Sequence, residues 1–222
     1  MNKKLTLPQT IIITLFCIMM ILAIFNMPQL GIFSIGVSAL FVVIATLSDR
    51  KGIFISIAMV ILGLVLFIKP IYIFDICLNF IIPGIIIGMI TKNVLNHRED
   101  NKYNPIFMGT IAFIIGLIAN YLISKYLFNI NILEEFTSVM KTQLSTQISA
   151  IQESVSSLAS VSNITEESII QTVLNIMPLI LFSRSIMLSI LTYFLAIYTL
   201  KKIRKNDLKE KLMQIKFSRF YL

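Results

Sequence analysis

Charged residues are scarce in this chain of 222 residues: they make up 14% of it, while 57% of the residues are hydrophobic. A soluble chain carries about 25% charged residues. The mean hydropathy of +0.88 and the 16 phenylalanines indicate more apolar surface than one soluble core of this size can bury. This composition excludes an ordinary soluble domain and predicts an integral membrane protein.

Histidine and cysteine are nearly absent, which excludes most catalytic and metal chemistry. The single histidine, His97, falls in a charged loop, so neither a histidine-based metal site nor a Ser–His pair can be built. Asp75 is the only aspartate inside an apolar run, which excludes a two-aspartate intramembrane protease. Cys17 and Cys77 lie in apolar runs without CxxC spacing and are interpreted as packing residues. We therefore predict no enzyme, no metal site and no cofactor.

Long apolar runs recur along the chain. The hydrocarbon layer is about 30 Å thick and a helix rises about 1.5 Å per residue, so a span needs about 20 apolar residues. Alternating polarity, the mark of a membrane β-barrel, is missing. We predict an all-α fold, a polytopic six-helix transmembrane bundle. The expected helices are 7–25, 30–47, 53–68, 71–90, 106–128 and 176–200.

Basic residues gather on one side of these expected spans. Retained Lys and Arg mark the cytoplasmic side of a membrane protein. If the segments cross in turn, 15 basic residues lie on the side that holds both termini and 3 on the other, namely Lys69, Lys125 and Lys141. We therefore expect both termini in the cytoplasm. The net charge of +8 then reflects topology, and it predicts no nucleic-acid partner.

Residues 129–168 differ from the rest because they are rich in Ser, Thr, Gln and Glu. Apolar residues still recur there at steps of three and four, which predicts one apolar stripe on a helix. We expect an extracytoplasmic helical insertion that forms a lid on the bundle; a coiled-coil dimerisation arm is the alternative. The stripe consists of Phe136, Met140, Leu144, Ile148, Ile151, Val155 and Leu158.

Two charged residues fall inside the expected spans, where a charge costs about 2.5 to 3.5 kcal/mol at the bilayer centre. Asp75 and Arg184 lie at similar depths from the outer side, about 6 to 12 Å. One interpretation is a structural ion pair between the fourth and sixth helices; another is a ligand site that opens outward. The polar residues that would complete such a site are Asn79, one turn below Asp75, and Asn120, Tyr121 and Lys125 on the fifth helix.

Two further features concern packing and the C-terminal end. Gly84 and Gly88 form a small-xxx-small face after Pro83, and we expect close contact with another helix of the same chain there. Residues 201–222 form a basic cytoplasmic tail with interspersed apolar residues. This tail either lies along the anionic inner leaflet or is a plain extension that sets topology.

Four segments follow one another in an order typical of a known family. They are the Pro83 to Gly88 region before a basic loop, residues 131–143 with Leu133, Glu134 and Glu135 near the start, residues 177–198, and the closing stretch 217–220. In this order they resemble the YybS-like bacterial membrane proteins, a domain of unknown function related in fold to the substrate-binding S components of energy-coupling-factor vitamin transporters. In that family the closing stretch leads into further membrane helices, so we expect a member truncated after Leu222.

The resemblance implies a small-molecule binding or transport subunit in the bacterial cytoplasmic membrane, in contact with the lipid bilayer and driven by an energising subunit. The transporter relatives dock that subunit on small residues four apart on the first helix, and here Thr10 and Thr14 have this spacing. The alternative is a non-transporting scaffold or regulator of envelope processes that acts through protein partners, similar to the rod-shape membrane proteins.

Overall fold

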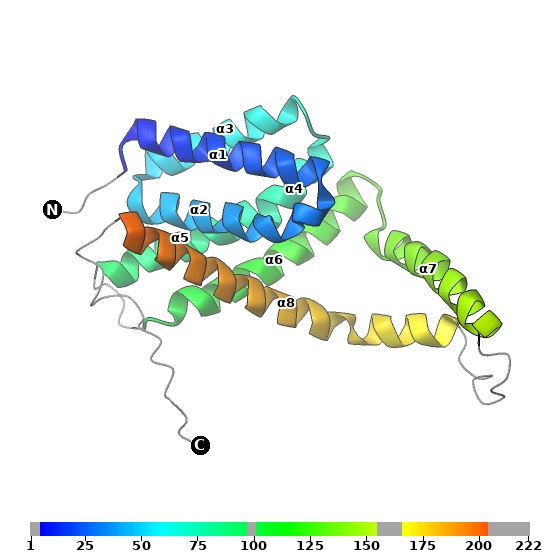
Figure 1. The fold of residues 1–222 in the computed structure, drawn as a ribbon. Helices are drawn as coiled ribbons and strands as arrows, with labels where there is room; N and C mark the ends of the chain where they lie inside the picture. Colours follow the sequence, from blue (N-terminus) through cyan, green and yellow to red (C-terminus); the bar gives the residue numbers. More distant parts are fainter. Residues whose placement is uncertain (1–4, 97–100, 155–165, 204–222) are drawn as a thin grey trace, which may run out of the picture. The chain divides into compact units, whose positions relative to one another are not determined.

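Every regular element is a helix in the residues that the computed structural model describes, 5–96, 101–154 and 166–203 (Figure 1). The all-helical expectation is confirmed for these residues. The element η1 is a 3₁₀-helix and η2 is a π-helix. In chain order the elements are α1 (Leu7–Asn26), η1 (Pro28–Phe33), α2 (Ser34–Leu47), α3 (Arg50–Val65), α4 (Pro70–Ile76), η2 (Cys77–Ile81), α5 (Ile82–Leu95), α6 (Asn104–Leu127), α7 (Ile132–Ser154) and α8 (Glu166–Ile203).

Five helical segments among the described residues are long and apolar enough to cross a membrane. The third expected span corresponds to α3, which has 16 residues and is shorter than these five. The last expected span is part of the 38-residue helix α8, which begins ten residues before position 176. The five segments are Leu7–Asn26, Gln29–Leu47, Pro70–Leu95, Asn104–Leu127 and Glu167–Ile203.

The chain divides into two compact units. The first consists of residues 1–117 and 185–222, and the second of residues 118–184. Helices α6 and α8 therefore each contribute one part to either unit. Two hydrophobic core clusters form among the described residues, and both belong to the first unit.

Helix α2 is the centre of the first unit. From Val37 to Leu47 every residue except Leu40 is buried. One of its faces, with Phe41, packs into a core shared with α1, α3 and α4. The other face, with Val43, packs into a core shared with α5, α6 and α8. In Figure 1 α2 lies between α1 and α5, in agreement with its contacts to both.

Two glycines of α5 allow it to approach α2 closely. A Cβ added to Gly84 would lie 2.5 Å from the carbonyl oxygen of Ser38, and one added to Gly88 would lie 2.6 Å from that of Val42. Such distances mean that the backbones of α2 and α5 are in contact. Lipid tails are as apolar as the side chains, so close packing of this kind is what holds membrane helices together. The small-xxx-small face thus packs against a helix of the same chain.

Hydroxyl groups join α3 to α1. The hydroxyl of Thr10 is 3.0 Å from that of Ser48, at the end of α2, and the hydroxyl of Thr14 donates to that of Ser56 at 2.9 Å. The three side chains Thr10, Thr14 and Ser56 are buried. Hydrogen bonds of this kind contribute about 0.6 to 2 kcal/mol each between membrane helices. The bond between Thr14 and Ser56 holds the short helix α3 against α1, and the bond between Thr10 and Ser48 holds the end of α2 against α1.

Helices α5, α6 and α8 meet around Gly109. A Cβ added to Gly109 would collide with the Ser189 hydroxyl oxygen and with the side chain of Ile87. The hydroxyl of Ser189 donates to the carbonyl oxygen of Ile106 at 2.7 Å. The second part of α8 therefore packs on α6 through small side chains, as α5 does on α2.

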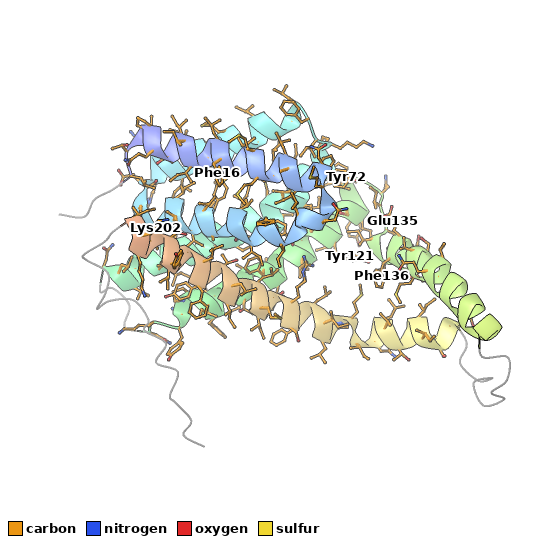
Figure 2. The ribbon with its side chains drawn as sticks, in the orientation of Figure 1. Phe16, Tyr72, Tyr121, Glu135, Phe136 and Lys202 are labelled. Carbon is orange, nitrogen blue, oxygen red and sulfur yellow. The ribbon has the colours of Figure 1, made fainter. Side chains whose placement is uncertain are left out.

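Large apolar side chains cover the outer faces of these helices. Phe16 on α1, labelled in Figure 2, is 50% exposed, and Phe54 on α3 is 73% exposed. A soluble protein rarely exposes apolar patches of this extent. Together with the five long apolar segments, they indicate contact with the lipid bilayer and a multi-pass membrane protein.

The second unit contains α7 and the first part of α8. Asn129, in the left-handed region with φ of 55°, turns the chain between α6 and α7. Phe136 and Met140 of the expected stripe are half-buried on α7, and the later members of the stripe fall among side chains outside the described set. A shallow cavity of about 320 Å³ lies between α7 and α8, lined by Leu133, Glu134, Thr137, Ser138, Lys141 and Leu174.

The contact between α2 and α5 predicts a large effect of one methyl group. Gly88→Ala places a Cβ against the backbone of Val42, which cannot move aside, so unfolding of the purified protein in detergent should show a loss of about 1 to 3 kcal/mol. The matched control is Gly31→Ala, because nothing lies within 4 Å of a Cβ at Gly31. Equal stability of both variants would contradict the backbone contact, because it would mean that α2 and α5 leave room for a methyl group at Gly88.

Candidate functional site

The structure brings two of the expected site residues together. Asp75 lies on α4 and Asn79 on η2, both in the first unit. Arg184 belongs to the second unit, so the expected ion pair between Asp75 and Arg184 stays a prediction. The same holds for the three expected wall residues on α6, which are Asn120, Tyr121 and Lys125.

Asp75 and Asn79 form a hydrogen-bonded pair along one helix face. The Nδ2 of Asn79 donates to the Oδ1 of Asp75 at 2.5 Å. Asp75 is half-buried, and the side chain of Asn79 is only 6% exposed. The Oδ1 of Asn79 is buried and has no hydrogen-bond partner among the described residues. A buried acceptor without a partner is costly, which makes this oxygen a candidate ligand-binding atom.

The π-helix η2 carries Asn79. At its end the N–H of Ile82 donates to the carbonyl oxygen of Cys77, five residues back. The next residue, Pro83, has no N–H, and in an α-helix its ring would clash with the carbonyl of Asn79. A wider turn relieves this clash. Single π-turns inside α-helices often occur at functional sites.

Gly116 of α6 makes room for this turn. A Cβ added to Gly116 would collide with the carbonyl oxygen of Leu78, and the Cα of Asn79 would lie 3.8 Å from it. The backbone of η2 therefore rests directly on α6. Sequence analysis missed both Leu78 and Gly116; the glycine in the middle of an apolar helix was the available signal, because glycine often marks close backbone approach.

In the second unit, Lys125 lies close to two aromatic rings. Its Nζ is 6.0 Å from the ring centroid of Tyr121 and 5.9 Å from that of Tyr126. Tyr121, on α6, is labelled in Figure 2. Lys125 is exposed in the last turn of α6, where a cation is favoured by the helix dipole. Arg184 on α8 is also exposed.

The two threonines of α1 that have the docking spacing lie inside the first unit. Thr10 and Thr14 are both buried, and their hydroxyls form hydrogen bonds with those of Ser48 and Ser56. A Cβ at Gly52 of α3 would also lie 3.8 Å from the side chain of Thr10. The small residues spaced by four on α1 therefore serve contacts within the chain, and the docking role that the resemblance implies for them is not supported.

The candidate site presents oxygen atoms. Asp75 supplies a carboxylate and Asn79 an amide oxygen, both of which accept hydrogen bonds or bind cations. No group of three or more His, Cys, Asp or Glu side chains gathers around a common point in the part of the chain that the structure describes. The amide oxygen of Asn79 is thus the atom of the pair that can accept a hydrogen bond from a donor group.

One comparison with known proteins gives a match. A family model described as "Predicted membrane protein (DUF2232)" matches residues 14–222, nearly the whole chain. No curated protein and no solved structure matches the chain.

The hydrogen bond between Asp75 and Asn79 predicts an energetic coupling. In a double-mutant cycle with Asp75→Leu and Asn79→Leu, unfolding in detergent should show a coupling of about 1.5 to 3 kcal/mol, typical of a hydrogen bond to a charged group. The control cycle combines Asp75→Leu with Asn26→Leu. Asn26 also donates to a group four residues back but is exposed at the end of α1, so its effect should be additive. Additivity within about 0.5 kcal/mol in the first cycle would contradict the pairing.

Proposed function

The chain belongs to the DUF2232 family of predicted membrane proteins, and we propose that it binds a small molecule in the outer half of the bilayer as a binding or transport subunit. In this proposal it resembles the S components of energy-coupling-factor transporters, as the YybS-like resemblance implies, and it is not an enzyme. The family match supports the membrane class. The chemistry of the site supports the binding role.

One observation carries the proposal, namely the Asp75–Asn79 pair on a π-turn. Ionisable residues in membrane helices are costly and are commonly functional. Asp75 follows Pro70, the first residue of α4, by five residues, which corresponds to about 8 Å along the helix. The side chain of Asn79 is buried with its amide oxygen unpartnered. A polar group of this kind, close to one membrane face, fits a ligand site better than a core contact.

The topology that we propose has six crossings with both termini in the cytoplasm of a bacterium. Helix α3 supplies the one crossing that is added to the five long apolar segments. Its 16 residues span about 24 Å, and Lys69 beyond its end can extend its side chain to the interface. Arg50 and Lys51 begin the helix and lie on the cytoplasmic side. Residues 129–168 are then outside the cell, where α7 belongs to the expected lid.

Helix α3 decides between six crossings and five. In a background with Cys17→Ala and Cys77→Ala, we expect Lys69→Cys to react with an impermeant maleimide in intact cells. Lys51→Cys should react only after permeabilisation, because α3 separates the two exposed positions. Equal labelling of both would show that α3 does not cross the membrane, and the termini would then lie on opposite sides.

Mass spectrometry of the gently purified protein tests the binding role. We expect a small molecule to be released on denaturation of the wild type, and its yield per folded protein to fall at least tenfold in Asn79→Leu. The control Asn26→Leu changes an exposed asparagine and should retain the molecule. If no small molecule is released while crosslinking in cells joins the chain to a partner protein, the scaffold function would replace this proposal.

A further inference from the structure

We propose that helix α3 binds one anionic phospholipid, whose phosphate contacts Arg50 and Lys51 and whose acyl chains lie along the apolar side chains that follow on the same helix. This inference goes beyond the proposed function, because it concerns a helix other than those that carry Asp75 and Asn79. Its basis is a groove on α3 in which basic and apolar side chains are combined.

The groove has a volume of about 470 Å³ and is lined by Arg50, Lys51, Phe54 and Ile55. The two basic side chains and Phe54 are exposed. A water-soluble ligand is usually buried over most of its surface in its site, which a groove on one exposed helix face cannot provide. A ligand that is itself part anionic and part apolar fits this order of side chains.

The apolar part of the groove continues along α3. Phe54, Ile61 and Val65 are all exposed, and their spacing of seven and four residues places them in one stripe. Arg50, four residues before Phe54, extends the stripe at its start, where α3 begins. The 16 residues of α3 span about 24 Å. A lipid whose head group lies in the groove therefore has its acyl chains on this stripe.

Charge balance favours an anion in the groove. The first turn of α3 contains no acidic residue, and two cations at this end of a helix are disfavoured by the helix dipole. Asp49 precedes the pair with one negative charge. Lys92 adds a positive charge nearby, since its Nζ donates to the carbonyl oxygen of Ser48 at 2.8 Å. Three basic side chains and one carboxylate leave a net charge of +2, which an anionic head group lowers.

The two basic side chains suit the phosphate of a lipid. The guanidinium of Arg50 can donate two parallel hydrogen bonds to phosphate oxygens, and the ammonium of Lys51 adds a mobile point charge. Both have long apolar stems that can lie on the helix while the charged ends reach the head-group region. A zwitterionic head group brings its own cation, which is repelled by this pair. We therefore expect a preference for lipids with a net negative charge.

Thermal unfolding of the full chain in detergent measures this preference. Phosphatidylglycerol is compared with phosphatidylcholine of the same acyl chains and with soluble glycerol phosphate. A ligand that binds only the folded state raises the melting temperature. At a phosphatidylglycerol concentration of 100 times its dissociation constant, the rise should be roughly 5 to 10 °C for a chain of this size. Neither of the other two compounds should reproduce it. An equal rise with phosphatidylcholine would overturn the recognition of charge, and an equal rise with glycerol phosphate would overturn the lipid as the ligand.

Removal of both charges tests the groove itself. In the variant with Arg50→Gln and Lys51→Gln, the dissociation constant of phosphatidylglycerol should rise at least about tenfold, because the charge-assisted hydrogen bonds to the phosphate are lost. Both side chains are exposed, so the variant should fold. An unchanged dissociation constant would contradict the site.

The matched control removes two charges from the end of α8, with Lys201→Gln and Lys202→Gln; Lys202 is labelled in Figure 2. This end lies near the start of α3, because Leu200 and Leu47 belong to one core cluster. The control should bind phosphatidylglycerol as the wild type does. An equal loss in both double variants would mean that the lipid responds only to the net charge of this end of the first unit, and the groove would not be its site.

A photoreactive phosphatidylglycerol locates the lipid on the wild type, whether or not the variants fold. Peptide mass spectrometry should find the crosslinks at residues 50–65, and an excess of phosphatidylglycerol, but not of phosphatidylcholine, should abolish them. Crosslinks spread evenly over the exposed faces of all helices would show a general lipid layer only and would overturn the site. A partner protein crosslinked to α3 in cells, without any preference for phosphatidylglycerol, would assign the groove to that protein instead.

Discussion

The contact between α2 and α5 is close enough for backbone to meet backbone. A Cβ at Gly88 would lie 2.6 Å from the Val42 carbonyl oxygen and equally close to the Cβ of Ala45. In a bilayer, where apolar side chains gain little by leaving lipid, such contacts carry much of the association energy between helices. With α5 fixed on one face of α2 and α1 on the other, α2 is enclosed by two cores.

This contact also positions the candidate site. Helices α4 and α5 belong to one continuous segment, Pro70–Leu95, and α5 is held on α2 by Gly84 and Gly88. The part of the segment before Pro83 is held separately, because the Leu78 carbonyl rests on Gly116 of α6. The π-turn between these two anchors sets how Asn79 faces Asp75. Helix packing on either side of the turn thereby fixes the relative positions of Asp75 and Asn79 inside the apolar bundle.

The sequence predicted the features that depend on local pattern. Apolar runs predicted helices because a span needs a minimum length, and the spacing of Gly84 and Gly88 indicated a close contact. Asp75 and Asn79, four residues apart, were placed on one helix face.

The π-turn was not predicted, because a proline allows a kink as readily as a wider turn, and the choice depends on the room that Gly116 leaves. The burial of Thr10 and Thr14 depends on Ser48 and Ser56, distant in sequence. The expected span 176–200 covers only the apolar part of α8, because polarity marks the end of a span without marking the end of a helix.

The enclosure of α2 is the central claim, and tryptophan scanning tests it directly in a chain that contains no tryptophan. Substitution at each position from Val37 to Leu47 should lower the yield of folded protein with no permissive face, because α2 is covered on both sides. On α1, substitutions at Ile12, Phe16 and Met19 should be tolerated, since these side chains are exposed to lipid. A tolerant stripe with a period of 3.6 residues along α2 would contradict the account, because it would mean that one face of α2 meets lipid.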